Sequence, residues 1–101
     1  MVMNPRVLVH LTMKSEQDGG RNAPFTEGYR PHFTIEEGEW LGVIATLCPG
    51  PVAPGDEADV EFELVYHPKV DYSALSGGVE FAMREGARVV ATGRVLSRND
   101  N

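Results

Sequence analysis

Three histidines and one cysteine are the side chains of this chain with the most potential for metal binding or catalysis. His10, His32 and His67 lie on separate segments, and no pair has the i, i+4 spacing of a helical zinc site. Cys48 belongs to no Cys-x-x-Cys motif and has no basic neighbour that would activate its thiol. The sequence therefore predicts neither a metal centre nor a bound cofactor.

Hydrolytic chemistry is also poorly supported. His67, Asp71 and Ser73 provide the side-chain types of a catalytic triad, but no nucleophile elbow surrounds Ser73. No Gly-x-x-x-x-Gly-Lys-[Ser/Thr] loop occurs, so nothing in the chain is built to cradle the phosphates of GTP. We therefore expect that the protein is not an enzyme and does not bind GTP.

Segment 19–33 concentrates glycine, proline, arginine and aromatic residues, a composition that excludes a helix. Pro24 and Pro31 favour extended geometry in the residues before them, which predicts a shaped, rigid loop. We expect its aromatic side chains to pack against a core: Phe25, Tyr29 and Phe33. We expect its cationic side chains to stay exposed: Arg21, Arg30 and His32.

The charge of the chain is negative and unevenly distributed. Nine basic and 15 acidic residues give a net charge of −6, which argues against general affinity for nucleic acid. Residues 31–68 contain no Lys or Arg and hold eight of the carboxylates. These are Glu36, Glu37, Glu39, Asp56, Glu57, Asp59, Glu61 and Glu63. The acidic middle of the chain is therefore expected to prefer a basic partner.

The length and the N-terminus bound the organisation of the chain. A chain of 101 residues has the length of one domain, which we place at 1–101 with a disordered tail at 97–101. The sequence lacks the apolar core of a signal peptide and any run of about 18 apolar residues. The cytoplasm is therefore the expected compartment, without membrane contact.

Alternating apolar and polar residues predict an all-β fold. We expect six strands at residues 6–14, 32–35, 40–47, 59–66, 79–84 and 88–96. Glu85 and Gly86 are the expected turn of the last hairpin. Leu8 and Val90 are apolar residues on faces that otherwise read as polar. An antiparallel barrel is favoured because it leaves no free edge strands, and a sandwich is the alternative.

Three separated motifs carry a resemblance to a known family. They are Gly19-Gly20-Arg21-x-x-Pro24-Phe25 running to Gly28-Tyr29-Arg30-Pro31-x-Phe33, then Pro54-Gly55-Asp56, then Phe81-Ala82-Met83-Arg84-Glu85-Gly86-x-Arg88-Val89-Val90. In order and spacing, over about residues 5–96, they resemble the C-terminal β-barrel domain of bacterial elongation factor Tu. The resemblance implies a six-stranded antiparallel Greek-key barrel. Because Met1 stands only a few residues before the first strand, we expect a stand-alone barrel without the GTPase domain of the factor.

The resemblance also implies contacts with RNA, since this barrel helps to grip the T-stem of aminoacyl-tRNA. Four positions carry the residues that the family has there: Arg21, Arg30, Glu85 and Gly86. Asn22 stands where a histidine is usual, His32 where a glutamine is usual, and His67 where a lysine occurs. The arginines would make forked bonds to phosphates, and the hairpin would reach the minor groove of the stem. Segment 36–41 departs from the family because it places carboxylates near those phosphates.

Two hypotheses follow for the function. The first is a non-catalytic binding module that works through protein contacts linked to translation. Its partner surface would be formed by Leu8, Glu36, Glu37, Glu39 and Val90. The second is an RNA-binding module that retains the T-stem grip, with tRNA as its partner. Salt dependence separates them, because phosphate contacts make affinity fall steeply with ionic strength.

Overall fold

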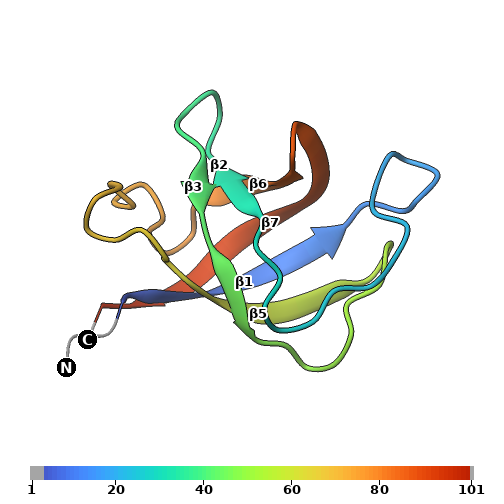
Figure 1. The fold of residues 1–101 in the computed structure, drawn as a ribbon, viewed down its shortest axis with the longest axis horizontal. Coiled ribbons are helices and arrows are strands. Elements are labelled where there is room, and N and C mark those ends of the chain that lie inside the picture. Colours follow the sequence, from blue (N-terminus) through green and yellow to red (C-terminus); the bar gives the residue numbers. More distant parts are fainter. Residues whose placement is uncertain (1–3, 101) are drawn as a thin grey trace.

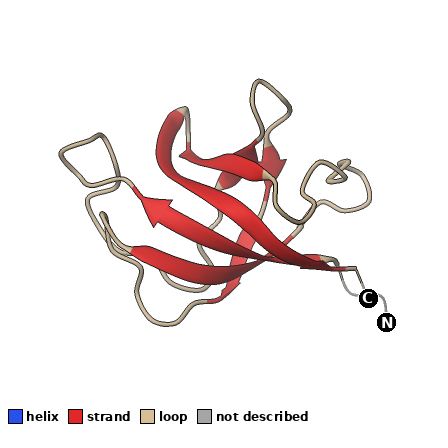
Figure 2. Cartoon of the chain, turned by 180° about the vertical axis from the view of Figure 1, so that it is seen from behind, coloured by secondary structure: helices blue, strands red, loops and turns tan. Residues whose placement is uncertain are grey.

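The alternating segments form the strands of one antiparallel sheet. A computed structural model describes residues 4–100, and the regular secondary structure in this part of the chain consists of β-strands alone (Figure 2). The strands are β1 (Arg6–Met13), β2 (His32–Thr34), β3 (Leu41–Gly42), β4 (Ile44–Leu47), β5 (Glu57–Glu63), β6 (Glu80–Glu85) and β7 (Arg88–Asn99). The start of β1 pairs with the end of β7, and Figure 1 shows them side by side.

The sheet curls until its two ends meet in one segment of the chain. Its strand order is β3-β2-β6-β7-β1-β5-β4, so it begins on β3 and ends on β4, which are separated only by Val43. The Val43 N–H donates to the Pro31 carbonyl at 3.2 Å. At Val43 the segment changes its pairing partner from β2 to β5. If β3 and β4 are counted as one strand, this strand pairs with β2 on one side and with β5 on the other, and β6, β7 and β1 complete the ring between β2 and β5. This is the Greek-key order of the expected barrel.

The expected strand at 40–47 is divided in the structure. It pairs with β2 through β3 and with β5 through β4, and the change of partner at Val43 breaks it into two pieces. The described residues therefore contain seven strands where six were expected, although the barrel is the same. The turn of the last hairpin is also shifted by one residue, because Glu85 pairs with Arg88 and leaves Gly86 and Ala87 at the tip.

Aromatic rings fill the middle of the barrel. Phe33 is fully buried and lies between two other phenylalanines, with ring centroids 4.9 Å from Phe62 and 4.1 Å from Phe81. Phe25 is also buried and joins Val52 in an isolated bridge. Loop 19–31 is therefore anchored on the core by its aromatic residues, as predicted.

Three expectations for exposure and order were wrong. Val90 is fully buried, because a register shift between Met83 and Arg84 in the β6–β7 pair turns both Val90 and Ala91 inwards. The strand expected at 59–66 ends early, at Glu63, and Tyr66 beyond it is 51% exposed. Residues 97–99 are not a frayed tail but pair with β1 as the end of β7. Residue 101 lies outside the described residues.

Candidate functional site

The loop and the hairpin that carry the RNA-binding expectation meet at Glu85. The guanidinium of Arg21 forms an ion pair with Glu85 Oε1, and the hydroxyl of Tyr29 donates to the same oxygen at 2.8 Å. Arg88 Nη2 lies 3.6 Å from Glu85 Oε2. Arg21 also covers the Tyr29 ring, with its guanidinium carbon 4.5 Å from the ring centroid. One carboxylate is thus held by two arginines and a phenol.

Local sequence features position this cluster. A Cβ at Gly20 would lie 2.3 Å from the Lys14 carbonyl oxygen, so only glycine allows the loop to leave β1 so closely. Phe25 stacks on Tyr29 with ring centroids 4.6 Å apart, which fixes the phenol above the core. Gly86 has a φ of 60°, which its position at the hairpin tip requires.

The cluster changes what its residues offer to a ligand. The Arg21 side chain is only 16% exposed, which corrects the expectation that it is free at the surface. Burial raises the pKa of the Tyr29 hydroxyl, opposed by the charges of Arg21 and Arg88, so Tyr29 stays a hydrogen-bond donor. Asn22, Arg30 and Gly86 are exposed around the cluster. The arrangement braces the loop against the hairpin, and its exposed rim is what remains for contacts.

His32 lies in a separate cluster on the outer face of the barrel. Its cross-strand partner is Arg84, and its ring centroid is 5.7 Å from that of Trp40. The Arg84 guanidinium carbon is 5.2 Å from the Trp40 ring centroid, and Nε donates to Thr34 Oγ1 at 3.0 Å. Sequence reasoning missed Trp40, Arg84 and Thr34. The pairing of two strands far apart in the chain brings them together, and no local pattern signals it.

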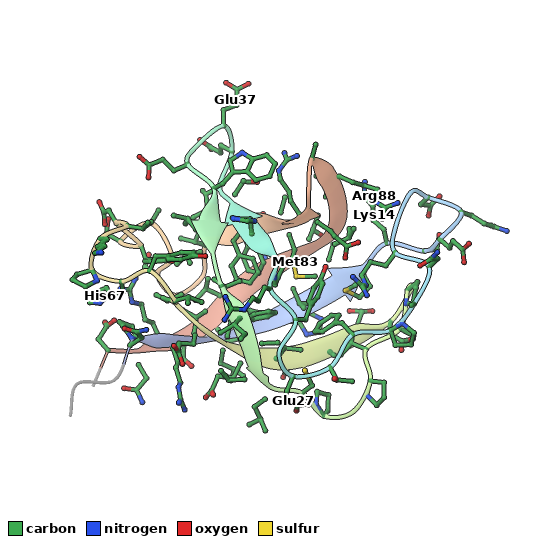
Figure 3. All side chains as sticks on the ribbon, in the orientation of Figure 1. Lys14, Glu27, Glu37, His67, Met83 and Arg88 are labelled. Atoms are coloured by element: carbon green, nitrogen blue, oxygen red, sulfur yellow. The ribbon has the colours of Figure 1, made fainter. Side chains whose placement is uncertain are left out.

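The remaining expected site residues are dispersed. His67 is exposed and lies far from Arg88, on the left of Figure 3, whereas Arg88 lies to the upper right. Leu8 is 38% exposed on the outer face of β1. The structure therefore does not bring His67 to the loop and hairpin cluster. Burial also removes Val90 from any partner surface in this conformation.

The acidic residues fall into two groups. On β5, Asp59 and Glu57 hold His10 between them, at 2.8 Å from Nδ1 and 3.0 Å from Nε2, and Glu61 lies 3.6 Å from Arg6. These hydrogen bonds, with Asp59 the larger cause, raise the pKa of His10. The alternation of β1 and β5 predicts that His10 and Asp59 lie on outer faces, but only the pairing of the two strands brings them together.

The second group lies on the loop between β2 and β3. Glu36, Glu37 and Glu39 are exposed, and within residues 4–100 no cation forms an ion pair with them. The loop turns through a hydrogen bond of 2.9 Å from the Gly38 N–H to the Ile35 carbonyl. Figure 3 shows Glu37 at the tip, pointing away from the barrel. These carboxylates are free to meet a partner.

Other candidate chemistry finds little support in the geometry. Burial and the nearby Glu27 carboxylate raise the pKa of Cys48 to about 11, so its thiol is protonated at neutral pH. Within residues 4–100 no group of three or more His, Cys, Asp and Glu side chains is arranged to hold a metal ion. The same part of the chain contains no helix long and apolar enough to cross a membrane.

Fold and surface together define a small antiparallel Greek-key barrel with a charged loop and hairpin on its surface. The chain matches the family model of the elongation factor Tu C-terminal domain over residues 6–98, and it belongs to that family. The domain described by this family is a non-catalytic barrel of a translation factor. The family and the fold expected from the sequence are confirmed.

Proposed function

We propose that this protein is a non-catalytic binding module that acts in the cytoplasm through contacts with a basic protein partner linked to translation. The observation that carries the proposal is the group of unpaired carboxylates on the loop between β2 and β3: Glu36, Glu37 and Glu39. Membership of a translation factor family supports the link to translation.

The contrast between the two acidic groups supports this choice of surface. The carboxylates of β5 already interact with Arg6 and His10, so a partner gains little by replacing those contacts. Those of the projecting loop have no ion-pair partner within residues 4–100. Charges that are exposed and unpaired steer the encounter with a partner of opposite charge and select against partners of the same charge.

Charge reversal tests this proposal. The immobilised protein is used to capture partners from a lysate, and the bound fraction is followed with increasing salt for wild type and for the triple variant Glu36→Lys, Glu37→Lys, Glu39→Lys. We expect the triple variant to lose the salt-sensitive partners. A variant with Glu37→Lys and Glu39→Lys is compared with a control of equal charge change, Glu16→Lys and Asp18→Lys, on the exposed turn after β1. Unchanged capture by the triple variant refutes the proposal.

A second candidate function is binding of the tRNA T-stem. The observation that favours it is the meeting of Arg21, Glu85 and Gly86 on adjacent surface segments, with Asn22, Arg30 and His32 also carried over from the family resemblance. The place of Arg21 against Tyr29 and Glu85 weighs against it, because the guanidinium is already engaged. His67, which lies far from Arg88 (Figure 3), would not share this contact.

Fluorescence anisotropy of labelled aminoacyl-tRNA at two salt concentrations tests the second candidate. Arg30→Ala is the informative variant because Arg30 is exposed, whereas Arg21→Ala also removes the brace to Glu85. Saturable, salt-sensitive binding that Arg30→Ala weakens supports the tRNA contact. Absence of binding at low salt removes it.

A further inference from the structure

The outer face of the barrel contains a hollow of about 740 Å³. It lies over β1, β7, β6 and β2, and loop residue Glu36 stands at its rim. Neither of the two functional hypotheses from the sequence assigned a role to this hollow.

A row of short side chains makes its floor. Thr12, Thr92, Ala82 and Thr34 are successive cross-strand partners on four neighbouring strands, and all four line the hollow. Longer side chains stand on both sides of the row. His10, Arg94 and Glu80 form the next cross-strand row on one side, and Arg84 stands on the other. The floor lies below its borders because threonine and alanine side chains are shorter than the charged side chains on both sides.

The position of the hollow restricts the backbone of its occupant. β1, β7, β6 and β2 each pair with a strand on both sides, so their main-chain groups are used within the sheet. A peptide on this face cannot add a strand, so the sheet offers no main-chain partners to its N–H and C=O groups. An α-helix satisfies these groups within itself and presents only side chains.

The charges around the hollow favour a cationic occupant. Two of the cations that line it are paired with carboxylates: Arg94 lies 3.3 Å from Glu80, and His10 is held by Asp59 and Glu57. Arg84 donates to Thr34 and to the Ala87 carbonyl, which are neutral, so it keeps its charge. Glu36 lines the rim and forms no ion pair with the residues that the structure describes. Arg84 and Glu36 therefore offset each other, and Glu37 and Glu39 on the same loop make the balance of unpaired charge negative.

Apolar side chains border the same surface. Leu96 lines the hollow and is 45% exposed, and Leu8, whose strand partner is Ser97, is 38% exposed. Trp40, 47% exposed, lies against Arg84 at the β2 side. Exposed apolar residues around a polar floor are suited to an amphipathic partner.

We propose that this hollow seats a cationic amphipathic helix of a partner protein. The inference rests on the proposed function, because it takes the same class of basic partner, and it adds the seat and the secondary structure of the bound segment. Lysine or arginine side chains of the helix reach Glu36, while its apolar face covers Leu96 and the methyl groups of the threonine row.

A synthetic amphipathic lysine–leucine helix is the probe for the test. Binding is followed by the fluorescence of Trp40, the only tryptophan in the chain, and by amide chemical shifts. A peptide of the same composition with scrambled order, which has no apolar face, is the first control. A glutamate–leucine helix is the second. We expect only the amphipathic cationic helix to bind, with shift changes on β1, β2, β6 and β7.

Thr92→Lys places a long cation in the floor, and Thr26→Lys makes the same change on the exposed part of loop 19–31. The two variants have equal net charge, so a difference between them reports the position of the added lysine. We expect Thr92→Lys to weaken the affinity for the peptide by about tenfold or more and Thr26→Lys to leave the affinity unchanged. Thr12→Lys, in the same row, repeats the test if Thr92→Lys does not fold.

Equal effects of the floor and loop variants, or no binding at low salt, overturn the proposed seat. The proposed function is judged separately. If the triple variant at Glu36, Glu37 and Glu39 loses its partners while Thr92→Lys keeps them, the acidic loop binds and the hollow does not. If neither variant changes partner capture, both proposals fail.

Discussion

The hydroxyl of Tyr29 donates a hydrogen bond of 2.8 Å to Glu85, joining loop 19–31 to the tip of the β6–β7 hairpin across 56 positions of sequence. Arg21 reaches the same carboxylate and covers the Tyr29 ring. In this chain, residues that resemble an RNA grip are thus also structural partners of one another. A loss of RNA binding in a variant of Arg21 or Glu85 must therefore be separated from a loss of structure.

Tyr29→Phe tests the structural role of the cluster. The change keeps the ring that stacks on Phe25 and removes only the hydroxyl, so we expect a loss of about 1 kcal/mol in the free energy of unfolding, measured by urea denaturation. Tyr66→Phe is the matched control, since that ring is 51% exposed and its hydroxyl makes no hydrogen bond within residues 4–100. Equal stability of Tyr29→Phe and wild type would show that the hydrogen bond from Tyr29 to Glu85 does not stabilise the fold.

His10 makes the stability depend on pH. Because Asp59 and Glu57 raise its pKa above the ordinary value of 6.5, the charged imidazolium is favoured in the folded state. The stabilisation is complete below pH 6.5 and is lost as the pH rises through the raised pKa of the folded protein. We expect the urea midpoint to fall across that interval, and His10→Gln to flatten the fall.

The measurement combines urea unfolding at a series of pH values with an NMR titration of the His10 ring. Arg94, the cross-strand neighbour of His10 on β7, is also charged but is paired with Glu80, so both carboxylates of β5 remain available to the imidazole. His67→Gln is the control, because it replaces an exposed histidine without an ion pair in the described part of the chain. The interpretation fails if His10→Gln retains the full pH dependence.

The sequence predicted those features that depend on neighbouring residues or on a regular alternation of apolar and polar residues. The period of two predicted the strands of β1, β5 and β6, and the aromatic residues of loop 19–31 predicted its anchoring. It failed at Val90, because the register shift beside Arg84 depends on how two strands fit together. It also missed Trp40 beside Arg84, which requires the pairing of β2 with β6. Tertiary pairing, not local propensity, decides such contacts.

Gly93→Ala tests the tight approach of β7 to the core. An added Cβ would lie 2.6 Å from Phe81 Cζ and 2.7 Å from the carbonyl oxygen of His10, which is held in the sheet. We expect the strain to lower the free energy of unfolding by about 1–3 kcal/mol. Thermal unfolding should show this as a drop of several degrees, since about 1 kcal/mol shifts the midpoint of a domain this size by about 4–8 °C.

Gly77→Ala is the control for the glycine substitution. The nearest atom to a Cβ at Gly77 is the Leu96 carbonyl oxygen at 4.0 Å, so the methyl group fits and the stability should change by about 0.5 kcal/mol or less. If Gly93→Ala is as stable as Gly77→Ala, then β7 can move away from β1 at small cost and the close packing at this position is not needed.

Tyr72 links the connection after β5 to the point where the barrel closes. Its side chain is 1% exposed, and its hydroxyl donates to the Gly42 carbonyl at 2.6 Å and accepts from the Tyr66 N–H at 3.1 Å. Tyr72→Phe leaves both main-chain groups without this partner, and an unsatisfied buried group costs about 1–3 kcal/mol. We expect a loss of that size in urea denaturation, together with faster hydrogen exchange at the Tyr66 amide.

The exchange measurement separates this role from simple packing. The phenylalanine ring preserves the apolar contacts of Tyr72, so a loss of stability without faster exchange at Tyr66 would place the effect elsewhere. Tyr66→Phe again serves as the control, because it changes an exposed ring and keeps the hydrogen bond from its own N–H to Tyr72. Since Gly42 belongs to β3, at one end of the curled sheet, weakening this bond should also speed exchange where β3 meets β2. Protection at β1 and β7, in the middle of the sheet, should persist, and uniform loss of protection over all strands would contradict a local role at the closure.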